Sequence, residues 1–329
     1  MPKTDPIEIT KQHWSPDAKP LVSVCNWVYN HKDYIKQSID SILMQKTTFQ
    51  VEIIIQDDAS NDGTREIIEE YAIRYPHLFN NILFEENQYS QDKDITIGLF
   101  NKASGKYIAL AHGDDYWTDP YKLQKQVDFL EENQEYVLCG GKVNILDSRN
   151  QNNKLQYDQQ YFVYDKCQEI EKSHCIHGFL LPFHTSTYVF RQSALNFNQL
   201  KRIQKNCISG DIIILNLLNS NGKIYYINNI FGVQHHNANG TTTHENHKGL
   251  NFLWNRVYMW RKIAKIAYSK SEFLKKSALR LSLNFEIILI GKIGNQSLSK
   301  RISFVRNTHY GQLRLFFLVL KLHIEKLIS

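Results

Sequence analysis

The chain has 329 residues, of which 42% are hydrophobic and 22% are charged. This is globular composition, and it excludes a disordered chain, a collagen and a coiled-coil rod. The formal net charge of +6 is unevenly distributed along the chain. Residues 251–329 carry 15 Lys/Arg against 3 Asp/Glu, a net +12, and residues 1–250 carry a net −6. A mildly acidic body with a strongly basic C-terminal segment indicates an anionic partner, either a membrane face or a nucleic acid.

The cysteine count and the apolar segments indicate the compartment. Five cysteines are few and odd in number, which favours reduced thiols in a reducing compartment. The N-terminus has no apolar stretch of the kind found in signal peptides. The longest uninterrupted apolar stretch near the C-terminus, 315–320, is much shorter than the ~20 residues of a membrane span. We therefore expect a cytoplasmic protein.

Apolar segments of strand length alternate with segments of helical spacing in the first half of the chain. Runs rich in β-branched residues predict strands over 21–28, 51–55, 81–84 and 107–111. Helical spacing follows the first two of these strands, and Thr118-Asp119-Pro120 predicts the start of a further helix. This alternation favours an α/β fold with a mostly parallel sheet covered on both faces.

The second half is less regular. Gly140 and Gly141 are expected to interrupt the apolar pattern that begins at Tyr136. Further strands are predicted at 187–190, 223–227 and 229–233, and a helix at 211–218. Since no proline follows Pro182, long helices are expected from Leu250 onward.

Two acidic pairs directly follow predicted strands: Asp57-Asp58 and Asp114-Asp115. Ligands of parallel sheets bind beyond the carboxyl ends of the strands, where both pairs would lie. Converging carboxylates repel unless they hold a cation or bind a polyhydroxyl ligand. The alternative is that they cap helices and remain solvated. His235 and His236, placed after a predicted strand and before a polar loop, are candidates for a metal or phosphate site.

Three motifs carry a resemblance to a known family: VSVCNWVYNHKDYIKQSIDSILMQ, QDDASNDGT, and ASGKYIALAHGDDYW with the following TDPYKLQKQVDFLEEN. Together they resemble glycosyltransferase family 2, over roughly 21–133 and weakly on to 243. The resemblance implies a GT-A fold, with a Rossmann-like nucleotide-binding layer built on a mostly parallel mixed sheet. It divides the chain into an N-terminal lead, a catalytic domain with a nucleotide-sugar half and an acceptor half, and a basic helical C-terminal extension. These parts would be 1–20, 21–245 (halves 21–133 and 134–245) and 246–329.

The resemblance also implies roles for single residues. Tyr29 would lie under the nucleotide base, and Asp58 would bind the base or the ribose. Asp114 would face the ribose or the diphosphate. Asp115 would hold the divalent metal, Mn²⁺ or Mg²⁺.

The remaining implied residues lie in the second half. Asp211 stands where the family places its catalytic base, although it could instead merely cap the helix that follows it. The segment 183–191 resembles the segment that lines the acceptor side. His235 or His236 would complete the metal site or bind phosphate, and we assign the metal role to His236.

The expected activity is the metal-dependent, inverting transfer of one sugar from a nucleotide-diphosphate sugar to a glycan or lipid-linked acceptor. The expected donor is a UDP-sugar, and the expected process is cell-surface polysaccharide synthesis. A cation relieves charge on the departing diphosphate, and a base activates the acceptor hydroxyl. The alternatives are a nucleotidyltransferase of related fold and a non-enzymatic binder of anionic polymers. Because the body is acidic, we expect no nucleic-acid partner. The basic extension is expected to bind the anionic inner face of the cytoplasmic membrane peripherally.

Overall fold

The structure is a computed structural model. It describes residues 5–15, 17–91, 95–147, 155–156, 161–177, 180–205, 207, 210–236 and 250–294. The chain divides into two compact units. The first comprises residues 1–205 and 209–237, and the second comprises residues 206–208 and 238–329.

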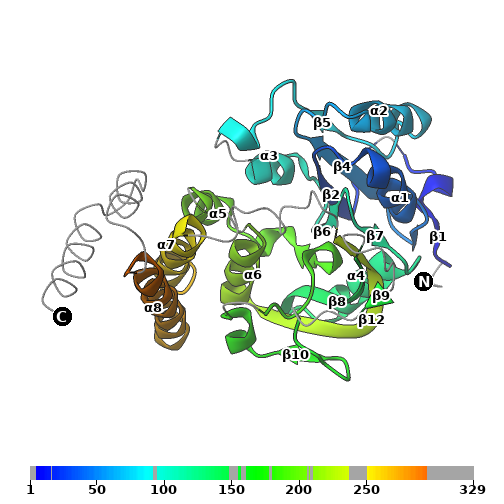
Figure 1. Cartoon of the computed structure of the whole chain (residues 1–329). Helices are drawn as coiled ribbons and strands as arrows, with labels where there is room; N and C mark the ends of the chain where they lie inside the picture. Colours follow the sequence, from blue (N-terminus) through cyan, green and yellow to red (C-terminus); the bar gives the residue numbers. More distant parts are fainter. Residues whose placement is uncertain are drawn as a thin grey trace, which may run out of the picture. The chain divides into compact units, whose positions relative to one another are not determined.

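In the described part of the first unit, ten strands form one curled sheet (Figure 1). These strands are β2 (Val22–Val28), β4 (Val51–Asp57), β5 (Ile82–Leu83), β6 (Tyr107–His112), β7 (Tyr116–Trp117), β8 (Tyr136–Asp147), β9 (Leu155–Gln156), β10 (Gln168–Ile170), β11 (Val189–Arg191) and β12 (Lys223–His236). Their order is β10-β12-β8-β11-β6-β2-β4-β5, with β7 paired to β12 and β9 paired to β8. A separate ribbon joins β1 (Ile7–Glu8) to β3 (Lys46–Thr47).

The pairing within the sheet is mixed. Strand β2 pairs in parallel with β4 and β6, β4 with β5, and β8 with β12. The short strand β11 runs antiparallel to both β6 and β8 and so joins the two parallel groups. The predicted α/β architecture with a mostly parallel sheet is confirmed.

Helices cover both faces of this sheet. The helices of the first unit are α1 (Lys32–Leu43), α2 (Thr64–Arg74), α3 (Ile95–Lys102), α4 (Lys122–Glu132), α5 (Phe197–Gln204) and α6 (Gly210–Asn221). Helices α1, α2 and α4 share one buried core with alternate residues of the central strands. On the other face, the Phe100 ring of α3 lies 5.6 Å from Trp27, 6.0 Å from Phe190 and 6.1 Å from Phe197. Side-chain alternation along β6 places His112 on this second face, 6.0 Å from Trp27.

Two strands are longer than the sequence pattern predicts. Strand β8 continues through Gly140 and Gly141, so the expected interruption there is wrong. A Cβ on Gly140 would overlap the Phe183 ring, and a Cβ on Gly141 would lie 2.7 Å from the Phe231 ring. These glycines therefore admit bulky neighbours rather than break the strand.

Strand β12 runs from Lys223 to His236, with register shifts along its pairing to β8. His235 and His236 thus lie within the strand and not beyond its predicted end at Val233, because they pair with Leu146 and Asp147 of β8.

The helix predicted from Pro120 begins slightly later, at Lys122. The Asp119 carboxylate accepts the backbone N–H of Tyr121 (2.9 Å), and the Asp119 carbonyl accepts that of Lys122 (3.1 Å). The residues before α4 therefore form a turn closed by Asp119.

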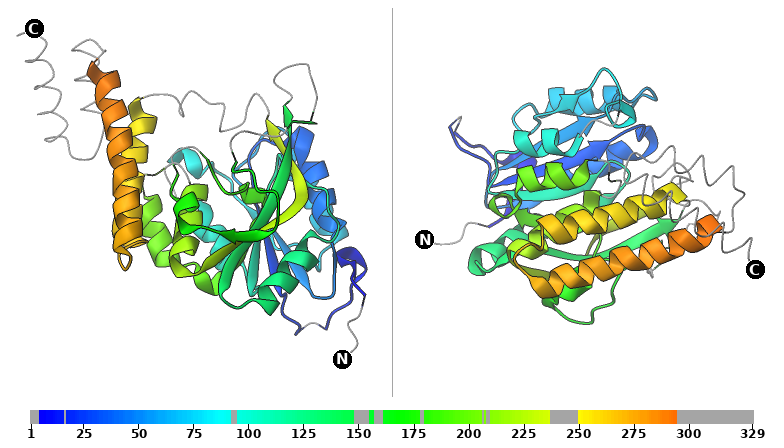
Figure 2. Two further views of the ribbon diagram at one scale, coloured as in Figure 1. Left: turned by 90° about the horizontal axis from the view of Figure 1, so that it is seen from below. Right: turned by 90° about the vertical axis from the view of Figure 1, so that its left-hand side faces the viewer.

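The second unit is helical where it is described. Helix α7 (Leu250–Ile266) and helix α8 (Glu272–Gly294) lie side by side (Figure 2). The Ser282 hydroxyl donates to the Val257 carbonyl (3.0 Å), and Arg261 pairs with Glu286 at 2.6 Å. Among the described helices, none is both long enough and apolar enough to cross a bilayer.

Candidate active site

Polar turns follow the central parallel strands at their carboxyl ends. The turn after β6 carries Asp114 and Asp115 and is closed by the Asp115 N–H, which donates to the His112 carbonyl (3.1 Å). The Gly113 N–H donates to the Trp27 carbonyl of β2 (3.1 Å). A Cβ on Gly113 would lie 2.5 Å from Nδ1 of His31, so only glycine leaves room for that imidazole.

Asp115 is the centre of a buried cluster. Its Oδ2 lies 3.2 Å from Nδ1 of His112 and 3.7 Å from Nδ1 of His184. Its Oδ1 accepts the backbone N–H of His235 (2.9 Å). Within the described residues, His112, Asp115 and His184 are the one group of three or more His, Cys, Asp or Glu side chains whose ligating atoms all lie within 4.8 Å of one another.

The protonation states of His184 and Asp115 suit cation binding. Burial lowers the pKa of His184 to about 4, against the attraction of Asp115. Burial opposes ionisation of Asp115, but its contacts with His184 and His112 and the His235 N–H hold its pKa below the ordinary value. A neutral imidazole beside an ionised carboxylate is the state in which both groups bind metal.

His112 and Asp114 have raised pKa values. Burial opposes protonation of His112, but the hydrogen bond and charge of Asp115, with the charges of Asp114 and Asp211, raise its pKa. Burial and then repulsion by Asp115 raise the pKa of Asp114, and His31, whose Nε2 lies 4.0 Å from Oδ2 of Asp114, opposes this. The edge of the sheet thus concentrates carboxylates and imidazoles whose charges depend on one another.

The predicted base Asp211 lies in the first turn of helix α6 and within electrostatic reach of the same cluster. Its carboxylate acts to raise the pKa values of His112, His184 and Tyr188. Asp211 therefore acts electrostatically on two members of the Asp115 cluster, although the sequence separates the two aspartates by more than ninety residues.

The predicted metal residue His236 is buried and acts to lower the pKa of His184. It is not a member of the compact group around Asp115 among the described residues. Its metal role stays a prediction.

The two predicted base-binding residues differ in environment. Asp58 is buried, and its carboxylate accepts the backbone N–H groups of Gln88 (2.7 Å) and Tyr89 (3.0 Å). Each of its oxygens keeps a further lone pair for a ligand. Tyr29 is 47% exposed at the end of β2. The nucleotide roles of Tyr29, Asp58 and Asp114 stay predictions.

Sequence reasoning missed His112, His184 and His31. His184 caps the short helical turn 185–187, where its Nδ1 accepts the Ser186 N–H at 3.3 Å. The available signal was a histidine directly before a run of hydroxyl residues, in a segment already expected to line the acceptor side.

The family model for "Glycosyl transferase family 2" matches residues 23–188, half of the chain. The chain belongs to glycosyl transferase family 2. The membership predicted from the three motifs is confirmed, and with it the enzyme class.

Curated relatives match over shorter segments. An uncharacterised protein of Mycobacterium tuberculosis is 44% identical over 127 residues, which are 38% of this chain and 36% of that protein. The putative teichuronic acid biosynthesis glycosyltransferase TuaG of Bacillus subtilis is 37% identical over 117 residues, 35% of this chain and 43% of TuaG. The match thus spans between a third and a half of the length of these relatives.

Solved structures support the fold. TarS 1–349 of S. aureus in complex with UDP-GlcNAc matches with a TM-score of 0.63 at 16% identity, over 87% of this chain and 78% of that chain. The complex of TarS 1–349 with UDP matches with a TM-score of 0.61 at 17% identity, over 86% and 78%. The family 2 chain therefore has the predicted GT-A fold.

Proposed function

We propose that this family 2 chain transfers a single sugar from a nucleotide-diphosphate sugar to a glycan or lipid-linked acceptor in cell-surface polysaccharide synthesis. The observation that carries the proposal is the convergence of Asp114, Asp115, His112, His184 and Asp211 at the carboxyl edge of the sheet. The UDP and UDP-GlcNAc complexes of TarS support a UDP-sugar donor. TuaG supports a polysaccharide acceptor.

The donor set around Asp115 fits a divalent cation. The Asp115 carboxylate and the imidazoles of His112 and His184 would hold it, with His236 close by. When bound, the cation neutralises charge on the leaving diphosphate. Because two of the three groups are imidazoles, we expect a first-row transition ion such as Mn²⁺ to be preferred over Mg²⁺.

The chain's own residues would divide the remaining work. Asp211 accepts the proton of the acceptor hydroxyl, since a hydroxyl is a poor nucleophile until a base lies within hydrogen-bond reach. One carboxylate acting opposite the leaving group gives direct displacement with inversion at the anomeric carbon. Tyr29 and Asp58 bind the base and ribose at the ends of β2 and β4.

A donor-hydrolysis assay tests the function. The protein should release UDP from at least one of a panel of UDP-sugars with Mn²⁺, release it more slowly with Mg²⁺, and lose the activity in EDTA. Asp115→Asn should lose both turnover and Mn²⁺-dependent UDP binding. Asp33→Asn, on an exposed carboxylate of α1, is the matched control and should behave as the wild type. Equal UDP release with and without EDTA would refute metal dependence.

The second unit supports peripheral binding to an anionic membrane. Its described residues 250–294 carry nine Lys/Arg against two Asp/Glu. Helix α8 carries the exposed apolar side chains Phe273, Leu283 and Ile288 as well as the exposed basic residues Lys276 and Arg280. Apolar and basic side chains on one helix suit the membrane interface, and each basic residue contributes about 1 kcal/mol near an anionic leaflet.

Vesicle sedimentation tests this part separately. The full chain should sediment with vesicles that contain anionic lipid, and ~0.5 M salt should release it by screening. Lys276→Glu with Arg280→Glu should weaken sedimentation. The control is Lys36→Glu with Lys201→Glu, which makes the same charge change on exposed lysines of the first unit. This control variant should sediment as the wild type does. Equal sedimentation of both double variants would refute α8 as the membrane contact.

A further inference from the structure

Trp117 joins the two chain segments that form the Asp115 cluster. It is the last residue of the GDDYW motif and of strand β7, two positions after Asp115. Its indole Nε1–H donates to the Ser186 carbonyl at 2.8 Å, and this bond is buried. Ser186 lies two positions after His184. A single hydrogen bond therefore joins the turn that carries the carboxylate to the turn that carries the imidazole.

The position of Trp117 is itself fixed by neighbouring elements. Its backbone N–H donates to Oγ of Ser41 on α1 (3.0 Å). It pairs with Gly232 of β12, where a Cβ would lie 2.6 Å from the Tyr116 carbonyl oxygen, so the glycine lets the two strands approach. The Lys122 ammonium lies 4.1 Å from the centroid of the indole. The buried indole is therefore a donor of fixed position.

Ser186 sets the orientation of the His184 ring. The Ser186 hydroxyl lies 2.7 Å from Nδ1 of His184, and the Ser186 N–H donates to the same nitrogen at 3.3 Å. This nitrogen lies 3.7 Å from Oδ2 of Asp115. A displacement of Ser186 would therefore carry the imidazole nitrogen away from the carboxylate.

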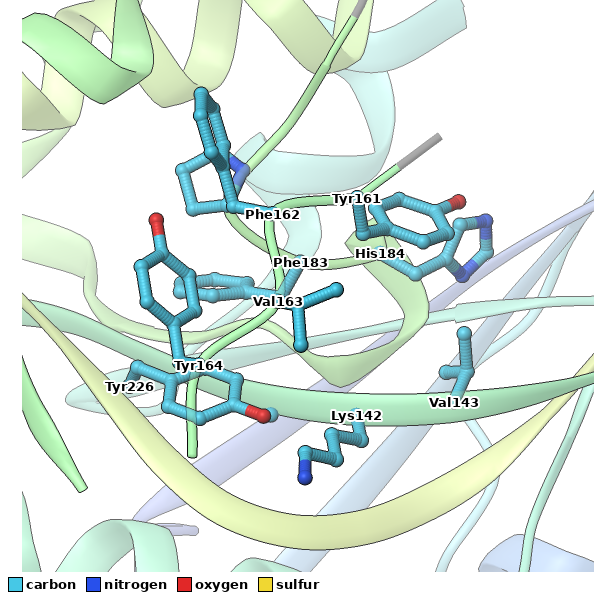
Figure 3. Close-up of a pocket in the computed structure, with 11 residues that line it drawn as sticks. Lys142, Val143, Tyr161, Phe162, Val163, Tyr164, Phe183, His184 and Tyr226 are labelled. Atoms are coloured by element: carbon cyan, nitrogen blue, oxygen red, sulfur yellow. The ribbon is translucent and has the colours of Figure 1, made fainter. Parts of the chain in front are cut away.

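Packing alone does not fix the His184 ring. A partly open pocket borders His184, and Figure 3 shows the imidazole next to the Tyr161 ring in the pocket lining. The two rings meet edge-on with centroids 5.8 Å apart, and the His112 ring meets His184 edge-on at 5.5 Å. Because the pocket leaves the imidazole room to turn, the hydrogen bonds from Ser186 decide where its Nδ1 points.

We propose that Trp117 is a positioning residue, which holds the His184 turn against the Asp115 turn so that both side chains bind the same divalent cation. This inference rests on the proposed function, because it needs the cation site proposed there. The indole acts through Ser186 and would touch neither the cation nor a substrate. Removing a contact that orients a metal ligand typically lowers metal affinity roughly 10–100-fold.

Mn²⁺ binding tests the inference without turnover. The probe is Mn²⁺ alone, titrated into the full chain and followed by the EPR signal of the free ion. Trp117→Phe keeps a ring beside Lys122 but removes the donor, and it should weaken Mn²⁺ binding roughly 10-fold. Trp260→Phe is the matched control, because Trp260 is fully buried on α7 and its Nε1 has no hydrogen-bond partner among the described residues. The control should bind Mn²⁺ as the wild type does.

A second measurement needs no metal. NMR of the histidine ring carbons in EDTA reports the surroundings of His184, whose signal is assigned by its loss in His184→Gln. Trp117→Phe should shift or broaden this signal, because the ring loses its fixed orientation, and Trp260→Phe should leave it unchanged. A wild type that binds no Mn²⁺, with a His184 signal that moves in Trp117→Phe alone, would refute the proposed cation site and support the positioning role.

A milder pair of variants guards against misfolding of Trp117→Phe. Ser41→Ala removes the acceptor of the Trp117 backbone N–H and should weaken Mn²⁺ binding by a smaller factor. Ser282→Ala is its matched control, because Ser282 is also a buried helical serine whose hydroxyl donates to a backbone carbonyl.

Three results would overturn the inference. The first is wild-type Mn²⁺ affinity together with an unmoved His184 signal in Trp117→Phe. The second is an equal loss of Mn²⁺ affinity in Trp117→Phe and Trp260→Phe, which would show a general loss of stability. The third is equal Mn²⁺ affinity in Ser41→Ala and Ser282→Ala.

Discussion

Replacing Lys122 with methionine should stabilise the protein at neutral pH, and the gain should shrink as the pH rises. Lys122 is fully buried on α4, and its Nζ has no hydrogen-bond partner among the described residues. The ammonium lies 4.1 Å from the centroid of the Trp117 ring. Burial lowers the pKa of Lys122 from 10.5 to about 7, while the more distant Cys139 and Asp119 act in the opposite direction.

The pH window follows from the direction of that shift. Below pH 7 the folded state must keep a buried charge, so the full cost of burial is present. Between pH 7 and 10.5 the folded protein releases the proton that the unfolded chain retains, so wild-type stability rises with pH. A fall in pKa from 10.5 to about 7 corresponds to at most roughly 5 kcal/mol.

The measurable gain is smaller than this limit. Methionine has a similar shape and needs no hydrogen bond, but it loses the cation–π contact with Trp117, which offsets up to about 2 kcal/mol. We expect Lys122→Met to gain about 2–3 kcal/mol in the free energy of unfolding at pH 6.5, and much less at pH 9.5.

Urea unfolding at several pH values measures the effect. Lys125→Met is the matched control. Lys125 lies three residues later on the same helix, its side chain is 47% exposed, and it pairs with Asp119. The control should change stability little at any pH. A difference between Lys122→Met and the wild type that is constant from pH 6.5 to 9.5 would refute the reasoning, as would a loss of stability at every pH.

Other substitutions probe the reaction and the sheet. Asp211→Asn should keep UDP-sugar affinity but lower turnover at least ~100-fold, the scale of a lost general base; a loss of affinity with turnover per bound donor unchanged would make Asp211 a binding residue instead. Gly140→Ala should destabilise the protein by about 1–3 kcal/mol in urea unfolding, because the new methyl group displaces Phe183. Gly98→Ala in helix α3, where a Cβ meets only an ordinary contact at 3.8 Å, should not destabilise it. Asp58→Ala should speed hydrogen exchange at the two backbone N–H groups that Asp58 binds, and unchanged exchange would show that those bonds do not order their loop.

The sequence was sufficient for the general architecture. The strands β2, β4 and β6 were predicted to within two residues at either end, because each is a short apolar run ended by a polar turn. The ends of parallel strands meet at one edge, so the same pattern predicted where the acidic pairs would lie. These features depend on residues close together in the chain, which a single sequence records directly.

The members of the cluster around Asp115 could be identified only from the tertiary structure. His112 lies three residues away and is visible in the sequence, but His184 arrives from the turn before β11, sixty-nine residues later. Its approach depends on β11 inserting antiparallel between β6 and β8, and nothing in the local pattern of either strand specifies that partner. The continuation of β8 through Gly140 has the same origin, since the reason for a glycine there is the ring of Phe183.

What the sequence by itself determined is therefore the set of elements and the edge at which their polar turns meet. What only the tertiary structure decided is which side chains from distant segments share that edge. The physical reason is that backbone propensity and apolar periodicity act over a few residues, whereas side-chain contacts across a sheet are set by strand order and register.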